Sequence, residues 1–344
     1  MKNEILIFSI ILSTVAPGII ATTHLSIYIA LPSFLLGLII AYLTYLLVNV
    51  KWDYQGLYGY AKDTHPLLGF IFLISWLISY YLYVVYTAIY IPYYVLNLDN
   101  IQATIISLFV GILVILALIT NPYYAFPAIA FSQIILAIPL GWKLQLGYTP
   151  PIPELFTNIL SSSLLVVCIT LSTFIKGEKK YSPYIIYAVL IYGIALLYGS
   201  FLSPDLIGVY ASAIGNFGLI LAEFTMIRNL LFSINKIRLY RVLVLLSLPI
   251  IGIGNINYSL FYNSLIFPSV SLLYLSLFVS FLSLYKYFSS AFVRVLTTIS
   301  LVLFIYGEYS IITITKSYLF YESVIAITLS VIIALILYYR KLSI

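Results

Sequence analysis

The stretch Thr14-Val15-Ala16-Pro17-Gly18 interrupts the first long apolar segment of the chain. The apolar run before it, residues 5–13, is long enough to start across a membrane. Proline removes a backbone donor and clashes with the preceding helical turn, whereas glycine tolerates almost any backbone angle. Inside a bilayer, freed backbone groups are tolerated only where protein or a water-filled cavity satisfies them. We therefore interpret this segment as a broken helix that helps to form a solute site; a proline-kinked spanning helix without a ligand is the alternative.

The composition indicates a membrane protein. Hydrophobic residues make up 63% of the 344 residues, charged residues make up only 8%, and the mean hydropathy is +1.14. A soluble domain is about a quarter charged. Apolar stretches of roughly 20 residues recur along the chain, and each can cross a hydrocarbon core of about 30 Å. Because these runs are continuous and do not alternate, they predict an all-α polytopic membrane protein and argue against a transmembrane barrel.

Cysteine and histidine usage gives no sign of a metal site. The single cysteine, Cys168, rules out an intramolecular disulfide and a cysteine-cluster site, and His24 and His65 lie far apart in the sequence. We expect no cofactor, no metal and no catalytic residue, with H⁺ or Na⁺ as the candidate coupling ions. The net charge of +6 indicates contact with anionic lipid at the cytoplasmic face and not with nucleic acid.

Hydropathy predicts twelve transmembrane helices. They cover about 4–23, 28–49, 66–95, 102–120, 124–145, 155–175, 183–202, 206–233, 242–260, 264–285, 291–313 and 318–339. With the N-terminus in the cytoplasm, fourteen of the 16 lysines and arginines fall in inner loops or at inner helix ends. Only Lys143 and Lys316 fall outside, in agreement with the positive-inside rule. We therefore expect a multi-pass protein of the cytoplasmic membrane with both termini in the cytoplasm.

The spacing of the helices indicates an internal repeat. Five predicted helices occupy residues 1–150, five more occupy residues 151–288, and residues 289–344 hold two additional helices. An odd number of spans per unit turns the second unit upside down, as an inverted repeat with a midplane substrate site requires. The sixth helix is then the counterpart of the first. We expect a second break at residues 168–173, although no glycine or proline marks it.

Three short motifs lie after the second predicted helix and in the first part of the third. They read Gln55-Gly56-Leu57-Tyr58-Gly59-Tyr60, then His65-Pro66-Leu67-Leu68-Gly69-Phe70, and then Trp76. This series resembles the amino acid–polyamine–organocation (APC) permease superfamily, whose members commonly show Gly-Gly-x-Tyr-x-Tyr, Gly-Pro-x-x-Gly-Phe and a tryptophan in the third helix. The likeness covers residues 1 to about 235, and beyond them only the number of helices agrees.

Other positions are similar to the same superfamily. Ala30-Leu31-Pro32 resembles its Ala-Gly-Pro entry to the second helix, and Arg228 resembles an arginine near the inner end of the eighth helix. Ala16-Pro17-Gly18 stands where the family has a Gly-Ser/Thr-Gly break. The chain departs from the family in lacking the Phe-Ser-Gly signature of the sixth helix and in being short.

The resemblance implies a secondary active transporter that moves an amino acid or related small amine by alternating access, coupled to a cation. Amides after Pro17 would face an anionic group of the substrate, and carbonyls ending the first half-helix would accept its ammonium. Each hydroxyl of the expected site has an alternative role as an interhelical hydrogen-bonder. The expected partners are this small-molecule substrate and membrane lipids. The candidate substrate-binding residues are Ala16, Pro17, Gly18, Ile19, Thr170, Ser172, Tyr80 and Tyr81.

Ionisable residues inside the predicted spans are the candidates for coupling. A carboxylate near the bilayer centre costs about 3 kcal/mol unless it is paired or protonated. Glu223 lies in the eighth helix, about one and a half turns before Arg228. It is a candidate for proton coupling, and a structural Glu223–Arg228 pair at an inner gate is the alternative. Sodium coupling would use Ser212, and Glu308 is expected to have a structural or dimer-contact role.

Two other functions remain open from the sequence. The first is a transport-inactive structural or sensory relative with the same fold, which the missing signature of the sixth helix favours. The second is a membrane enzyme acting on lipid or glycan, which generally needs clustered carboxylates and long loops. The short loops and the lack of an Asp-x-Asp or histidine-rich cluster argue against an enzyme. No acidic residue is assigned to the pocket, so neutral or hydrophobic amino acids are the preferred solutes.

Overall fold

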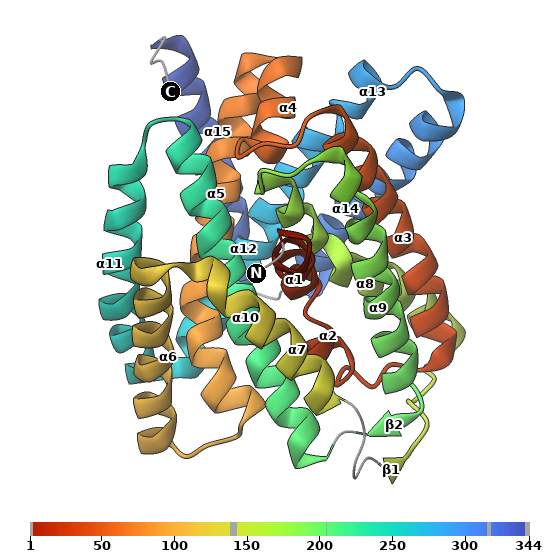
Figure 1. Cartoon of the computed structure of the whole chain (residues 1–344), viewed down its shortest axis with the longest axis vertical. Coiled ribbons are helices and arrows are strands. Elements are labelled where there is room, and N and C mark those ends of the chain that lie inside the picture. The colour runs from red at the N-terminus through yellow and green to blue at the C-terminus, as the bar shows by residue number, and fades with distance from the viewer. Residues whose placement is uncertain (1–2, 138–142, 204, 315–317, 341–344) are drawn as a thin grey trace.

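The computed structural model describes residues 3–137, 143–203, 205–314 and 318–340, which form a bundle of helices with one short β-ribbon (Figure 1). The elements of the first half are α1 (Asn3–Val15), α2 (Pro17–Ile20), α3 (Ile27–Val50), α4 (Gly56–Thr64), α5 (Pro66–Tyr90), the π-helix η1 (Ile91–Val95), α6 (Asn100–Thr120), the 3₁₀ helix η2 (Pro122–Tyr124), α7 (Ala125–Ala137) and β1 (Lys143–Leu144).

The second half is also mostly helical. Its elements are α8 (Ile152–Ser163), the 3₁₀ helices η3 (Leu164–Phe174) and η4 (Lys179–Tyr181), α9 (Pro183–Gly199), β2 (Leu202–Ser203), α10 (Leu206–Ser233), α11 (Ile237–Gly254), the 3₁₀ helix η5 (Asn255–Asn257), α12 (Tyr258–Phe281), α13 (Leu284–Tyr287), α14 (Ala291–Ile314) and α15 (Tyr318–Tyr339). Strands β1 and β2 pair antiparallel, with Lys143 opposite Ser203.

The helical class and the multi-pass character are confirmed. Ten stretches of the described residues are long and apolar enough to cross a membrane. One of them, Ile237–Tyr287, has 51 residues and contains both α11 and α12. The apolar helix Pro122–Ala137 is shorter and is not among the ten. The number twelve therefore stays a prediction.

The turns between the helices follow from local sequence. Asp99 and Asp205 each cap a helix, with a carboxylate oxygen accepting from the backbone N–H of Gln102 at 2.9 Å and Gly208 at 3.0 Å. His65 precedes Pro66, the first residue of α5, and proline at this position loses no helical hydrogen bond. These caps satisfy donors that a helix end leaves free.

Helices α5 and α12 form the most extensive pair in the structure. Ser79 and Ser269 join them by two reciprocal hydrogen bonds, in which each hydroxyl donates to the carbonyl of the other residue, at 2.7 and 2.9 Å. Nearer one end, Tyr93 stacks on Tyr258 with ring centroids 3.9 Å apart. The C-terminal helices α14 and α15 pack against α12, and α15 also packs against α5.

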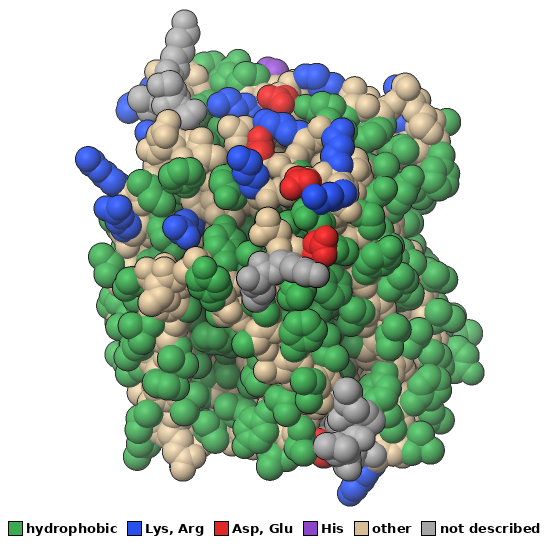
Figure 2. All heavy atoms as spheres, viewed as in Figure 1, with side chains coloured by type: hydrophobic (Ala, Val, Ile, Leu, Met, Phe, Trp, Pro, Cys, Tyr) green, Lys and Arg blue, Asp and Glu red, His purple; other side chains and the backbone are tan. Residues whose placement is uncertain are grey.

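Charged side chains are unevenly distributed along the long axis. On the face drawn in Figure 2, the basic side chains gather toward the end of the molecule where Figure 1 places α4 and α13. Between the ends the surface is largely hydrophobic, with large apolar side chains exposed on most helices. This distribution is typical of a protein whose middle faces lipid.

The serine pair makes the first testable prediction. Ser79→Ala and Ser269→Ala should each lower the free energy of unfolding in detergent or bicelles by about 0.6 kcal/mol, the average for an interhelical hydrogen bond in a membrane protein. Their effects should be nearly additive, because each hydroxyl bonds a backbone carbonyl and not the other hydroxyl. Ser276→Ala is the matched control, since its buried hydroxyl donates within its own helix to Leu273 at 2.7 Å. An equal cost for Ser276→Ala would contradict the interhelical role.

Candidate functional site

The interruption expected near the start of the chain lies at Ala16. Helix α1 ends at Val15, Ala16 adopts the left-handed conformation with φ 42° and ψ 62°, and α2 begins at Pro17. A residue before proline avoids the right-handed helical region, and proline fits the first position of a new helix. A left-handed alanine costs roughly 1–2 kcal/mol. The break is therefore encoded by Pro17 and maintained at the expense of backbone strain.

The amides of α2 have partners within the protein. Ile19 and Ile20 donate to the carbonyl of Ala16 at 2.9 and 3.3 Å, and Gly18 donates to Oε1 of Gln133 at 3.2 Å. Gln133 lies on α7 and is fully buried. A solute that used the Gly18 amide would therefore have to displace this side chain. Gln133 was not among the residues expected from the sequence, although an amide in the middle of the apolar segment 124–145 is a detectable signal.

Helix α2 lies in backbone contact with α10. A Cβ at Gly18 would stand 2.4 Å from the carbonyl oxygen of Ala211, and one at Gly215 would stand 3.2 Å from the amide nitrogen of Ile19. Ser212, the candidate sodium ligand, follows Ala211 at this contact and is 6% exposed. Its carbonyl accepts from the side-chain amide of Asn216 at 2.9 Å.

The second discontinuity is a change of helix type. Helix α8 ends at Ser163, and the next eleven residues, Leu164–Phe174, form the 3₁₀ helix η3. Runs of 3₁₀ helix longer than three or four residues are uncommon and mark hinges or strain. The Thr170 hydroxyl donates to the Val167 carbonyl at 2.6 Å, within η3. The Ser172 hydroxyl is buried and has no hydrogen-bond partner among the described residues.

A cavity of about 220 Å³ lies between these two discontinuous helices. Elements α1, α2, α5, α8, η3, α10 and α12 contribute to its wall. Its polar lining residues carry hydroxyl or thiol groups, and no charged side chain lines it among the described residues. These polar lining residues are Thr14, Ser79, Tyr80, Tyr83, Ser161, Cys168, Ser269 and Tyr274.

The structure brings together only part of the expected substrate site. Ala16, Ile19 and Tyr80 line the cavity. The other candidates lie outside its lining: Pro17, Gly18, Thr170, Ser172 and Tyr81. Among the residues not named from the sequence, Tyr83 could have been found, because it lies one helical turn from Tyr80 on the same face of α5. Ser269 and Tyr274 gave no such signal, since their approach depends on the pairing of α12 with α5.

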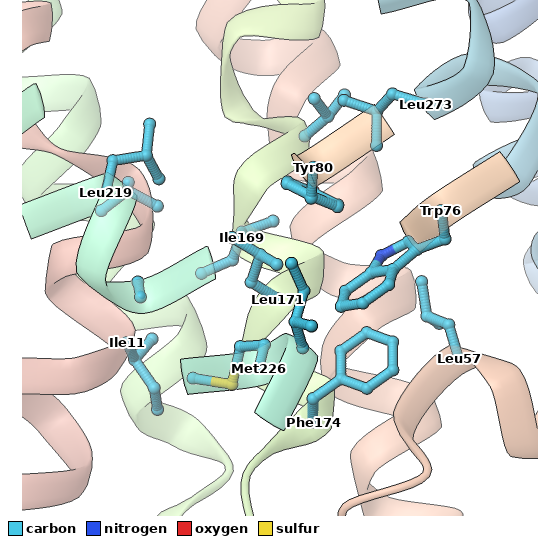
Figure 3. Packing of buried hydrophobic residues seen from close by; sticks show 14 of the residues in the cluster. Ile11, Leu57, Trp76, Tyr80, Ile169, Leu171, Phe174, Leu219, Met226 and Leu273 are labelled. Atoms are coloured by element: carbon cyan, nitrogen blue, oxygen red, sulfur yellow. The ribbon is translucent and has the colours of Figure 1, made fainter. Parts of the chain in front are cut away.

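An aromatic layer closes one side of this cavity. Trp76 lies between Tyr80 and Phe174, with ring-centroid separations of 4.9 and 4.5 Å, and Phe72 follows at 6.1 Å from Trp76. Figure 3 shows Tyr80, Trp76 and Phe174 lying one after another in the core. Phe174 is the last residue of η3 and lies next to Gly56, the first residue of α4.

Helix α4 and the segment before it support the aromatic layer. Gly56 has φ 50°, and a Cβ there would stand 2.5 Å from the ring of Phe174. Trp52 donates its indole N–H to the carbonyl of Ser172 at 2.9 Å. Gly56 and Trp76, both from the sequence motifs, therefore lie against the same ring, that of Phe174 at the end of η3.

Glu223 is fully buried on α10, one turn beyond the cavity-lining Leu219. Neither carboxylate oxygen has a hydrogen-bond partner within the described part of the chain. Its electrostatic neighbours include Tyr80, Tyr83 and Cys168, all of which line the cavity. An ionised carboxylate in such a place is costly. This position therefore suits a group that takes up a proton.

Glu223 and Arg228 do not form the ion pair considered from the sequence. The ion pairs among residues 3–137, 143–203, 205–314 and 318–340 are Lys51–Asp53 and Lys180–Glu178. Arg228 lines a different cavity, together with Arg241. The two candidate coupling residues are therefore in separate environments, five positions apart on one helix.

Neither a known protein-family model nor a curated protein matches this sequence. Within the described ranges, no group of three or more histidine, cysteine, aspartate or glutamate side chains is arranged to hold a metal ion. The site is an uncharged cavity between two interrupted helices, with a buried carboxylate beside it. Such a site can bind a small solute and a proton.

The break at Ala16 makes the second testable prediction. Ala16→Gly should raise the free energy of unfolding by up to about 1 kcal/mol, because glycine adopts the left-handed conformation without strain. Gly18→Ala should lower it by roughly 2 kcal/mol or more, because the added methyl group meets a backbone oxygen.

Gly252→Ala is the control for both variants. A Cβ at Gly252 has its nearest neighbour at 4.0 Å, so this change adds the same methyl group without a clash. Reversible unfolding in bicelles or by steric trapping measures all three. A destabilising Ala16→Gly would show that the left-handed conformation is not the cost we assign to this site.

Proposed function

We propose that this protein is a secondary active transporter that moves a small solute across the membrane by alternating access. One observation carries the proposal: a cavity lies between two helices that both lose regular α-helical structure where they line it, at Ala16 and at Leu164. Discontinuous helices at a central site are typical of transporters built from inverted repeats. The resemblance of the sequence motifs to the amino acid–polyamine–organocation superfamily leads to the same class.

The pattern of helix contacts supports two inverted units, residues 1–150 and 151–288. If each unit has five helices, α3 of the first corresponds to α9 of the second, α5 to α10, α6 to α11 and α7 to α12. A two-fold relation then exchanges contact pairs. The pair α3–α8 becomes α9–α1, α5–α12 becomes α10–α7, and α5–α11 becomes α10–α6; all six contacts are present. We count α7, α11 and α12 as separate spans, which gives twelve with α14 and α15.

The charge distribution supports an orientation in the cytoplasmic membrane. We assign the end that carries α4 to the cytoplasm, because lysine and arginine gather there (Figure 2) and positive loops are retained inside. Both termini are then cytoplasmic. The aromatic layer of Tyr80, Trp76 and Phe174 closes the cavity toward that side, so transport requires these rings to separate.

The lining of the cavity favours an uncharged or zwitterionic solute. Hydroxyl groups and apolar side chains surround it, and its volume of about 220 Å³ suits a small amino acid or amine. Glu223 is the coupling residue of this proposal, and binding and release of its proton accompany the solute. Sodium coupling through Ser212 is the competing mechanism.

Filling the cavity tests the proposed site. The purified protein should melt at a higher temperature with one solute from a panel of neutral amino acids and amines, because a ligand stabilises the state that binds it. At 100 times Kd the stabilisation is about 2.7 kcal/mol.

Cys168→Leu adds bulk to the lining and should abolish this shift and the uptake into proteoliposomes. Cys168→Ser keeps the size and should retain both. A shift that survives Cys168→Leu would place binding elsewhere.

Glu223→Gln tests the coupling step. Uptake by the unaltered protein should increase with an inward proton gradient, whereas the Gln variant should bind solute but show no response to the gradient. Glu308→Gln is the control, since Glu308 lies on α14 and lines another cavity, which shares only Tyr274 with the proposed site. A gradient response that persists in Glu223→Gln would exclude this carboxylate from coupling.

A second function is favoured by one observation. The Gly18 amide, which a substrate carboxylate would use, is already bonded to Gln133. A non-transporting relative that keeps the fold as a structural or sensory protein would have this arrangement. Such a protein would give no thermal shift with any solute in the panel, which separates it from a transporter.

A further inference from the structure

A second cavity of about 660 Å³ lies between α6, η2, α10 and α11. Its lining residues combine two arginines, three tyrosines, an asparagine and four apolar side chains. They are Tyr54, Leu118, Ile119, Tyr123, Arg228, Asn229, Phe232, Ile237, Tyr240 and Arg241. It shares no lining residue with the cavity between α1 and η3.

The two arginines supply positive charge that the protein does not neutralise. Neither Arg228 nor Arg241 forms an ion pair within the described ranges, where the ion pairs are Lys51–Asp53 and Lys180–Glu178. No aspartate or glutamate among the described residues lines the cavity. Guanidinium groups pair with phosphate in a forked geometry. The cavity is therefore complementary to an anion.

A buried hydroxyl provides independent evidence for a polar ligand. Tyr240 is only 7% exposed, and its hydroxyl has no hydrogen-bond partner among the residues described. Tyr240 lines the cavity and interacts electrostatically with Arg228 and Tyr123. An unpartnered buried hydroxyl costs free energy unless a ligand or water bonds it. Its position beside Arg228 makes an oxygen-rich ligand the matching partner.

The rim of the cavity indicates that the ligand reaches it from the bilayer. Ile119 and Phe232 line the cavity and are 73% and 61% exposed. The neighbouring helices α6 and α11 also carry exposed apolar side chains, including Leu116 and Leu245. A free phosphate ion would gain nothing from such a rim, whereas acyl chains would cover it. Basic pockets between helices at the cytoplasmic side suit lipid headgroups.

We propose that this cavity binds the phosphate headgroup of one anionic phospholipid. Arg228 and Arg241 hold the phosphate oxygens, Tyr240 donates its free hydroxyl, and the acyl chains lie against the exposed apolar rim at α6 and α10. The site is continuous with the core, because Tyr123 donates to Oδ1 of Asn229 at 3.0 Å and Asn229 donates to the Phe174 carbonyl at 2.9 Å. Asn229, which lines the cavity, is therefore one hydrogen bond from Phe174 of the aromatic layer.

Native mass spectrometry of the full-length protein in detergent measures the binding. The probe is dioctanoyl phosphatidylglycerol, titrated against dioctanoyl phosphatidylcholine, glycerol phosphate and inorganic phosphate. We expect one tight phosphatidylglycerol per chain, with at least about 10-fold weaker binding of phosphatidylcholine, because charge-assisted hydrogen bonds are lost or opposed. Equal affinity for both lipids would overturn the proposal. Full competition by inorganic phosphate would assign the cavity to a free anion and would also overturn it.

Three variants locate the site. Arg228→Gln with Arg241→Gln should weaken phosphatidylglycerol at least about 10-fold. Tyr240→Phe, which retains the ring, should weaken it by about 5-fold. Arg294→Gln with Arg340→Gln removes the same charge from exposed positions on α14 and just after α15 and should change affinity less than 2-fold.

The readouts separate local from general effects. The single variant Arg241→Gln is included because Arg241 is exposed and its replacement should not impair folding; it should weaken the lipid on its own. Equal losses in the cavity and control pairs would mean that only net charge matters and would refute a defined site. Binding is measured without solute, so failure here leaves the transport proposal intact.

Discussion

The structure depends on one constraint: a helix broken inside a membrane must satisfy its backbone with protein. At Ala16 the partners of the backbone groups all lie within a few residues of the break or on the adjacent helix α7. The Ala16 carbonyl accepts from Ile19 and Ile20, Gln133 accepts from Gly18, and α10 approaches α2 so closely that no side chain fits between them. Any spare backbone group would cost several kcal/mol in a dry interior. The cavity exists beside the break because the surrounding helices supply these partners.

The second interrupted helix uses a different solution. Helix η3 keeps its hydrogen bonds by tightening to the 3₁₀ form, and threonine hydroxyls add bonds inside the same turns, as Thr170 and Thr173 do. It therefore needs no proline. A tighter helix advances about 2.0 Å per residue instead of 1.5 Å, so the same residues reach farther. This extension brings Phe174 to the aromatic layer with Trp76.

The sequence was sufficient for features that depend on local chemistry. The membrane class follows from composition, and the break at Ala16 follows from Pro17. The 3₁₀ form of η3 could be expected only as an unspecified discontinuity, because no residue type in it is diagnostic. Gln133 and Ser269 reach the site region through tertiary packing of α7 and α12, which no local pattern reports. Whether the two halves are inverted copies stays a prediction.

The same distinction between local sequence and tertiary packing explains which of the expected site residues line the cavity. Ala16, Ile19 and Tyr80 face the cavity because they flank the break or lie on the inward face of α5. Thr170 and Ser172 were named because they lie in residues 168–173, where a second break was expected opposite the first. In the structure this segment is 3₁₀ helix, whose residues are spaced by a larger angle than in an α-helix, and Cys168 is the residue of this segment that lines the cavity. The Glu223–Arg228 pair was inferred from sequence distance alone. Five residues along a helix do not bring two side chains to the same face as well as three or four do.

Glycine contacts on both sides of α2 limit how the molecule can move. Gly18 meets the backbone of Ala211 on α10, and Gly199 at the end of α9 meets the carbonyl of Ala21, where a Cβ would stand 2.5 Å away. Where main-chain atoms are in direct contact, no side chain lies between the helices, so no change of rotamer can accommodate a relative movement of the two helices. The segment after the break is therefore held by α9 and α10 through direct main-chain contacts, and we expect it to move together with them in any conformational change. Relative movement of helices is easier where aromatic rings pack on one another, because rings can slide past each other without breaking a main-chain contact.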